Sequence, residues 1–121
     1  MTKVLVVEDI PFNMELILDI FKAMNFIVHG ASNGEEAVRM TQKEQYDFII
    51  MDIEMPIMDG ITAIKIIKTN PAYANIPIVV ITAYAMKGDR EKFLSLGFDD
   101  YIAKPIDVLS FMKKMEKYRT E

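Results

Sequence analysis

Four short apolar runs in this sequence are each followed at once by a side chain that can take part in chemistry. The pairs are Val4–Val7 with Glu8 and Asp9, Phe48–Met51 with Asp52, Ile78–Ile81 with Thr82, and Tyr101–Ala103 with Lys104. If the runs are parallel strands, their carboxyl ends lie along one edge of a sheet, where ligands bind. Three carboxylates, one hydroxyl and one ammonium group are then expected to converge on one patch.

The clustered acids predict a site for a hard divalent cation. Carboxylates packed closely together resist full ionisation, and Mg²⁺ relieves this repulsion because it takes oxygen ligands, typically one or two carboxylates with waters and phosphate oxygens. Asp52, at the end of the expected central strand, is the candidate nucleophile, because a carboxylate can take up a phosphoryl group as a mixed anhydride. Thr82 and Lys104 are suited to orient and neutralise the phosphoryl oxygens.

Each of these residues also has an ordinary structural explanation. An acid after a strand, such as Asp9, often solvates a loop or caps the next helix. Thr82 alone suits a turn, and Lys104 alone suits a solvated surface. The conjunction favours a functional site, because four separate strand ends would each need the right side chain by chance.

The elements that must position these residues alternate between strands and helices. The apolar runs do not alternate with polar residues, which is typical of strands buried on both faces, and Phe26–Gly30 is expected to be a further strand. Helices are expected over Pro11–Met24, Asn33–Lys43, Ile61–Lys68 and Lys87–Leu96, and from Asp107 onward. Five βα units predict an α/β flavodoxin-like (βα)5 fold, a doubly wound parallel sheet with strand order 2-1-3-4-5, in a single domain over residues 1–121.

Composition narrows the class of protein. The chain has 121 residues, a formal net charge of −4, no cysteine and one histidine. Disulfides, thiolate metal sites and multi-histidine metal sites are therefore excluded, and the net charge does not suit a nucleic-acid-binding protein. No apolar run is long enough for a membrane span and the N-terminus does not suit a signal peptide, so we expect a cytoplasmic protein.

The sequence resembles response-regulator receiver domains of two-component signalling, from Lys3 to about Lys117. The stretches that carry the resemblance are Val4–Asp9, Met51–Gly60, Ile81–Met86 and Asp100–Pro105. Their order and spacing are more specific than any one of them. The chain is especially similar to stand-alone cell-division regulators and to the receivers of hybrid histidine kinases.

The resemblance implies a role for each acid. Asp52 is implied to be the phosphoacceptor, and Asp9 to bind Mg²⁺ directly. Glu8 is implied to bind the metal directly or through water, although an aspartate is common at its position. Glu54 is implied to contribute its backbone carbonyl to the metal, which leaves its side chain for other work.

The resemblance also implies how the site switches. Thr82 is implied to move and hydrogen-bond the phosphoryl group, while Tyr101 rotates inward. Lys104 is implied to pair with a phosphoryl oxygen, or with Asp52 before phosphorylation, and the Lys104–Pro105 bond to be cis. Glu54 and Tyr84, two residues beyond Asp52 and Thr82, predict slow autodephosphorylation.

The expected function is a phosphorylation-dependent switch and not an enzyme. A sensor histidine kinase or histidine phosphotransfer protein is expected to dock on the opening of the first helix, at Ile10, Pro11, Asn13 and Met14, although Ile10 and Met14 could equally be core residues. An unidentified downstream protein is expected to bind the face that includes Tyr84, Met86, Lys87, Tyr101 and Lys114. No direct contact with nucleic acid or membrane is expected. The start at Met1 favours a stand-alone regulator over a receiver excised from a longer chain.

Three rival functions have distinct requirements. A flavin-binding electron carrier needs a phosphate loop after the first strand, where Glu8 and Asp9 would repel phosphate. An aspartyl-phosphate phosphatase pairs its nucleophile with an aspartate two residues on, where this chain has Glu54. A degenerate receiver that only binds partners would lack Mg²⁺-dependent phosphorylation.

Overall fold

Five parallel strands form the sheet in a computed structural model that describes residues 1–83 and 89–120. The strands are β1 (Lys3–Val7), β2 (Ile27–Ala31), β3 (Phe48–Asp52), β4 (Ile78–Thr82) and β5 (Asp100–Ala103). Their order in the sheet is β2-β1-β3-β4-β5, and all four neighbouring pairs are parallel. The predicted fold class and strand order are therefore confirmed.

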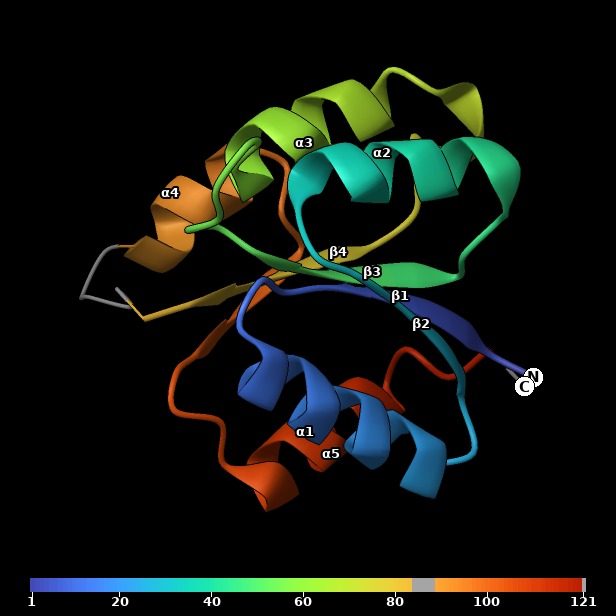
Figure 1. The fold of residues 1–121 in the computed structure, drawn as a ribbon, viewed down its shortest axis with the longest axis vertical. Coiled ribbons are helices and arrows are strands. Elements are labelled where there is room, and N and C mark those ends of the chain that lie inside the picture. The colour runs from blue at the N-terminus through green and yellow to red at the C-terminus, as the bar shows by residue number, and fades with distance from the viewer. Residues whose placement is uncertain (84–88, 121) are drawn as a thin grey trace.

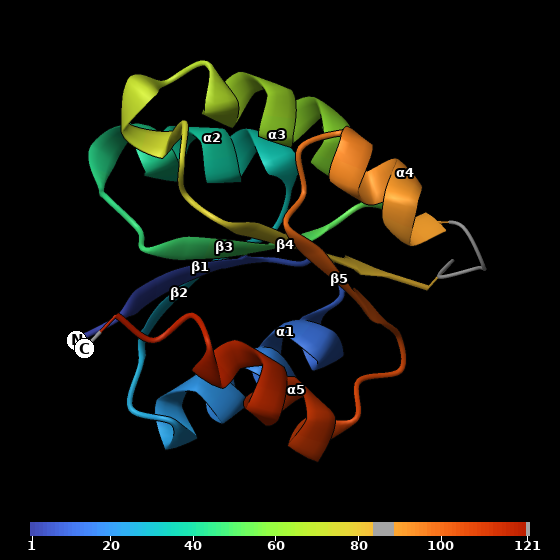
Figure 2. The same ribbon diagram turned by 180° about the vertical axis from the view of Figure 1, so that it is seen from behind.

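Helices cover both faces of this sheet. The α-helices are α1 (Pro11–Ala23), α2 (Gly34–Lys43), α3 (Gly60–Lys68), α4 (Asp89–Ser95) and α5 (Val108–Glu116), and a short 3-10 helix, η1, spans Pro71–Tyr73. Figures 1 and 2 show α1 and α5 on one face and α2, α3 and α4 on the other. The expected helices are all present. Only the start of the fourth, at Lys87, falls outside the described residues.

Local sequence explains where two of the helices begin. The Asn33 side chain accepts a hydrogen bond from the Glu36 amide at 2.9 Å and caps α2, and Asp59 accepts one from the Thr62 amide at 2.7 Å and caps α3. Both bonds satisfy amide groups that have no partner inside the helix. Gly97, with φ of 103°, follows α4 in a left-handed conformation that glycine adopts without strain.

Successive residues along β1, β3 and β4 pack against opposite helical layers. Val4 and Val6 lie in the core between the sheet and α1 and α5, while Leu5 and Val7 lie in the core beneath α2 and α3. All four side chains are fully buried. This explains the lack of polar alternation in the strands, since neither face of the sheet is solvated.

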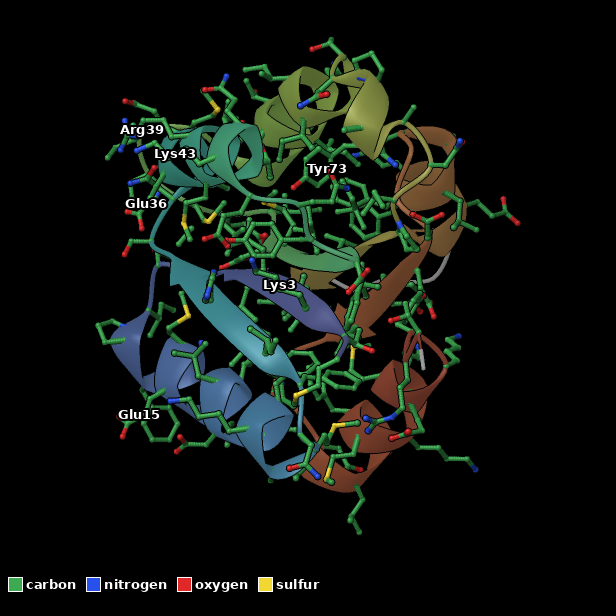
Figure 3. All side chains as sticks on the ribbon, turned by 90° about the vertical axis from the view of Figure 1, so that its right-hand side faces the viewer. Lys3, Glu15, Glu36, Arg39, Lys43 and Tyr73 are labelled. Atoms are coloured by element: carbon green, nitrogen blue, oxygen red, sulfur yellow. The ribbon has the colours of Figure 1, made fainter. Side chains whose placement is uncertain are left out.

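Several charged side chains of the helices point away from these layers. Figure 3 shows Glu15 pointing outward from α1 and Arg39 and Lys43 on the outer side of α2, whereas Tyr73 turns toward the sheet. Tyr73 is fully buried, and its hydroxyl accepts a hydrogen bond from the Tyr46 amide at 3.1 Å. None of the helices in the described part of the chain is long and apolar enough to cross a membrane.

Candidate functional site

The residues that were predicted to take part in chemistry lie at the carboxyl edge of the sheet. Asp52 and Thr82 are the last residues of β3 and β4, while Glu8 and Lys104 directly follow β1 and β5. From β1 the chain runs to β2 at one edge of the sheet, and from β3, on the other side of β1, it runs to β4 and β5 toward the opposite edge. Such a reversal of strand order opens a crevice beside the strand ends, where ligands bind in doubly wound sheets.

The three acids form a compact group of oxygen ligands. One carboxylate oxygen from each of Glu8, Asp9 and Asp52 lies within 4.8 Å of the others. The Oδ1 atom of Asp9 is buried and has no hydrogen-bond partner among the described residues. A buried, unpartnered carboxylate oxygen is unfavourable by itself, so this donor set fits a divalent cation such as Mg²⁺.

Lys104 brings a positive charge to the acids of the site. Its Nζ lies 2.9 Å from Glu8 Oε1 and 3.1 Å from Asp52 Oδ2. The side chain of Lys104 is only 16% exposed, and both carboxylates are almost fully buried. The resemblance implied the pairing with Asp52, whereas the pairing with Glu8 was not foreseen. One ammonium group therefore serves two buried carboxylates.

The two buried acids that share Lys104 have pKa values shifted in opposite directions. Burial raises the pKa of Asp52 to about 7, and the neighbouring Glu8 adds to the rise, against the opposing effect of Lys104. Burial also raises the pKa of Glu8, but hydrogen bonds from Lys104 and from the Ile10 amide outweigh it and leave that pKa below its usual value. Glu8 is therefore the carboxylate that remains charged, and Asp52 ionises last as the pH rises.

Close packing fixes the backbone around Asp52. The Glu54 amide donates a hydrogen bond to Asp52 Oδ1 at 3.2 Å, and the Gly60 amide donates one to the Ile53 carbonyl at 3.0 Å. A Cβ atom at Gly60 would lie 2.4 Å from the Asp52 carbonyl oxygen. Glycine is therefore required where the start of α3 meets the end of β3.

The loop between β3 and α3 holds a strained residue. Ile57 has φ of 70°, and the Met58 amide donates a hydrogen bond to the Pro56 carbonyl across it at 2.8 Å. A β-branched residue rarely adopts a positive φ, and the Ile57 side chain is 77% exposed. The strain is thus not balanced by burial of the side chain.

Ile57→Asn is expected to stabilise the protein by about 1 kcal/mol, because asparagine tolerates positive φ. The free energy of unfolding in urea measures this. Ile66→Asn is the matched control, since Ile66 is a partly exposed isoleucine inside α3, and it is expected to destabilise. Equal destabilisation by both changes would show that Ile57 packs usefully despite its exposure.

The predicted switch residues, Thr82 and Tyr101, lie on the neighbouring strands β4 and β5. Thr82 is 1% exposed, and its Oγ1 donates a hydrogen bond to Glu54 Oε1 at 3.0 Å. Tyr101 is partly buried, with its ring centroid 6.2 Å from that of Phe93. Lys114 Nζ donates a hydrogen bond to the Tyr101 carbonyl at 3.2 Å. The bond between Thr82 and Glu54 was not foreseen, because a sequence does not fix which way an exposed glutamate turns.

The Lys104–Pro105 peptide bond is cis, as the resemblance implied. No feature of the sequence itself separates it from an ordinary trans X-Pro bond.

The structure describes some of the residues of the two predicted partner-binding surfaces. Met14 packs against the core, as one of the two alternatives held, whereas Ile10 is 46% exposed and is not a core residue. Pro11 is exposed and Asn13 is partly buried. Tyr84, Met86 and Lys87 of the predicted downstream face lie outside the described residues.

Comparisons with known proteins agree on the family. A family model of the response regulator receiver domain matches residues 4–116. The chain is 36% identical over 115 residues to the polar-differentiation response regulator DivK of Brucella anthropi, covering 95% of this chain and 94% of that protein. DivK of Brucella ovis is also 36% identical, over 119 residues that cover 98% of this chain and 97% of that protein.

Solved structures give the same result. The chain resembles the chemotaxis response regulator CheY4 of Vibrio cholerae, with a TM-score of 0.92, 25% identity, and coverage of 98% of this chain and 99% of that chain. It also resembles the receiver domain of the sensor histidine kinase PA1611 from Pseudomonas aeruginosa, whose structure has magnesium coordinated in the active site cleft. That match has a TM-score of 0.87 and 32% identity, and covers 97% of this chain and 96% of the other. This protein therefore belongs to the family of response regulator receiver domains of two-component signalling.

Proposed function

We propose that this protein is a switch that accepts a phosphoryl group on Asp52 and changes its protein-binding face in response. The donor is a phosphohistidine on a sensor histidine kinase or a histidine phosphotransfer protein. The observation that carries the proposal is the position of Asp52, buried at the end of β3 with Lys104 Nζ 3.1 Å from Oδ2. In this proposal the chain has no external substrate to turn over and is not an enzyme in that sense.

In the proposed reaction, an Asp52 carboxylate oxygen attacks the phosphorus of the phosphohistidine. A P–O bond forms and the P–N bond breaks, and the imidazole nitrogen keeps the electron pair and takes up a proton. Lys104 lies where it can neutralise a phosphoryl oxygen, because its Nζ already contacts Asp52. The Thr82 hydroxyl then donates a hydrogen bond to another phosphoryl oxygen.

Mg²⁺ is the proposed cofactor of this reaction. Glu8, Asp9 and Asp52 would hold it, with the Glu54 backbone carbonyl as a further ligand. The bound cation supplies charge neutralisation for the phosphoryl oxygens. The buried Asp9 oxygen with no hydrogen-bond partner among the described residues supports this assignment, as does the magnesium in the related Pseudomonas receiver.

The proposed donor docks beside α1. Ile10 and Phe12 are 46% and 75% exposed at the opening of this helix, next to a groove of about 480 Å³ that Phe12, Asn13 and Lys104 help to line. An apolar rim that reaches the acceptor site suits a protein partner that must bring its histidine to Asp52.

The proposed downstream partner binds on the side of β5 and α5. A groove of about 500 Å³ there is lined by residues that include Tyr101, Phe111, Lys114 and Lys117. Rotation of Tyr101 would change the shape of this groove, which couples it to the acceptor site. The slow autodephosphorylation expected from Glu54 and Tyr84, the cytoplasmic location and the single domain over residues 1–121 remain predictions.

Intact mass after incubation with acetyl phosphate tests the proposal. The wild type is expected to gain one phosphoryl mass in the presence of Mg²⁺ and none in EDTA. Asp52→Asn is expected to gain none in either condition. Because some receivers refuse small donors, a negative result is repeated with a phosphorylated histidine phosphotransfer protein. No gain from either donor would support the reading in which the chain only binds partners.

A further inference from the structure

The Thr82 hydroxyl is already engaged in the unphosphorylated protein. Its Oγ1 donates to Glu54 Oε1 at 3.0 Å, and Thr82 is 1% exposed. A hydroxyl has one proton, and an ionised carboxylate only accepts. In this state the hydroxyl donates its hydrogen bond to Glu54. In the proposed switch, the same hydrogen bond goes to a phosphoryl oxygen.

Glu54 connects the acceptor strand to the switch strand. Its amide donates to Asp52 Oδ1 at 3.2 Å, while its carboxylate accepts from Thr82. Asp52 pairs with Ile81 in the parallel register of β3 and β4, so Thr82 lies one residue further along the same edge. A single residue thus orients the proposed acceptor through its main chain and holds the proposed switch hydroxyl through its side chain.

We propose that the Glu54 carboxylate is a latch that holds Thr82 in the unphosphorylated state and opposes activation until a phosphoryl group displaces it. This inference rests on the proposed function. Hydrogen bonds to charged acceptors are stronger than neutral ones, so the bond favours the resting state. A switch biased in this way has a smaller active population before phosphorylation.

Phosphorylation opens the latch in two ways. It replaces the single negative charge of the Asp52 carboxylate with a phosphoryl group that carries roughly −1.5 to −2, and this group repels the nearby Glu54 carboxylate. It also presents new acceptor oxygens to Thr82. The hydroxyl exchanges one anionic acceptor for another, so the transfer leaves no buried donor without a partner.

A double-mutant cycle tests the latch with beryllofluoride and Mg²⁺ as a non-covalent phosphoryl mimic. With the natural Thr82 in place, Glu54→Ala is expected to tighten binding of the mimic by about 5- to 30-fold. The reason is that this change removes the hydrogen bond that stabilises the resting state. Part of this gain would come from lost charge repulsion alone. In the Thr82→Ala background only that part remains, so we expect the gain there to be smaller by more than twofold. Equal gains in both backgrounds, within twofold, would overturn the latch.

Two further variants separate charge from hydrogen bonding. Glu54→Gln keeps an acceptor oxygen without the charge, so it is expected to fall between wild type and Glu54→Ala. Glu35→Ala makes the same change in net charge at an exposed position of α2, and it is expected to leave binding of the mimic unchanged. A gain from Glu35→Ala as large as that from Glu54→Ala would assign the effect to net charge and contradict the latch.

The side-chain rotamer of Thr82, measured by three-bond NMR couplings without any mimic, gives an independent readout. Glu54→Ala is expected to shift the rotamer populations, and unchanged populations would overturn the latch even if the protein is phosphorylated normally. Failure of the wild type both to bind the mimic and to accept a phosphoryl group would instead contradict the proposed function, and the latch with it.

Discussion

Asp52→Asn is expected to stabilise the metal-free protein by about 2 kcal/mol at pH 8, even though it removes the proposed acceptor. The Asp52 side chain is almost fully buried and shares the Lys104 ammonium with Glu8. Its ionisation therefore places a second negative charge on a buried pair that has one cation. Asparagine keeps the shape of the side chain and removes that charge.

The effect of Asp52 on stability depends on pH in a definite direction. Its pKa is raised from an ordinary 3.8 to about 7 in the folded protein, so between these values the folded state binds more protons than the unfolded chain. Stability from this group is complete below about pH 4 and is lost as pH rises toward 7. The difference in stability between wild type and Asp52→Asn is therefore expected to grow from pH 5 to pH 8.

Urea unfolding in EDTA at pH 5 and pH 8 measures this difference. Asp19→Asn is a suitable control, because Asp19 is an exposed carboxylate on α1, and its effect on the free energy of unfolding is expected to be small at both pH values. Millimolar Mg²⁺ at pH 8 is expected to stabilise the wild type more than Asp52→Asn, since it binds the folded acids. A loss of stability in Asp52→Asn at pH 8 in EDTA would contradict this account of the site.

Lys104→Met is expected to destabilise the metal-free protein by about 3 kcal/mol at pH 8, because removing one partner leaves buried charges uncompensated. Methionine fills a similar volume, so the loss reports charge more than packing. Asp52 and Glu8 would then face each other without the ammonium that now lies 3.1 Å and 2.9 Å from them. Phosphorylation by acetyl phosphate, followed by intact mass, is expected to slow by at least tenfold, about the effect of losing one charge-stabilising group.

Two further variants test whether the charge of Lys104 carries this effect. Lys104→Met combined with Asp52→Asn is expected to recover most of the lost stability, because one buried charge is removed with the cation. Lys114→Met removes a more exposed lysine, 36% exposed, that pairs with Asp100 at 3.4 Å, and a much smaller loss is expected there. If Lys104→Met does not fold in EDTA, its urea midpoint is measured in Mg²⁺. An Lys104→Met protein as stable as the wild type in EDTA would refute the shared-cation account.

The fold could be predicted because each strand and helix has a strong local signal. Runs such as Val4–Val7 are buried on both faces, so they lack alternation, and Asn33 and Gly97 mark helix ends. The short helix at Pro71–Tyr73 was missed, since three residues are too few to produce a helical period. The convergence at the sheet edge followed from parallel topology alone.

Other features of the site depend on side-chain directions that the sequence does not encode. The contact of Lys104 with Glu8 and that of Glu54 with Thr82 join residues from different strand ends. Strand order predicts that such residues lie near one another, but not which of several acids a long side chain reaches. The strained Ile57 could not be foreseen either, because isoleucine is a residue that positive φ disfavours.

Mapping the phosphoryl group to a single residue tests the central claim most directly. Protein phosphorylated with a donor and Mg²⁺ is treated with borohydride, which reduces an aspartyl phosphate to homoserine, and its peptides are then sequenced by mass spectrometry. We predict homoserine at position 52 and at no other aspartate of the chain. Reduction at another aspartate, or a stable phosphoryl group on a hydroxyl or histidine side chain, would contradict the assignment of Asp52 as the phosphoacceptor.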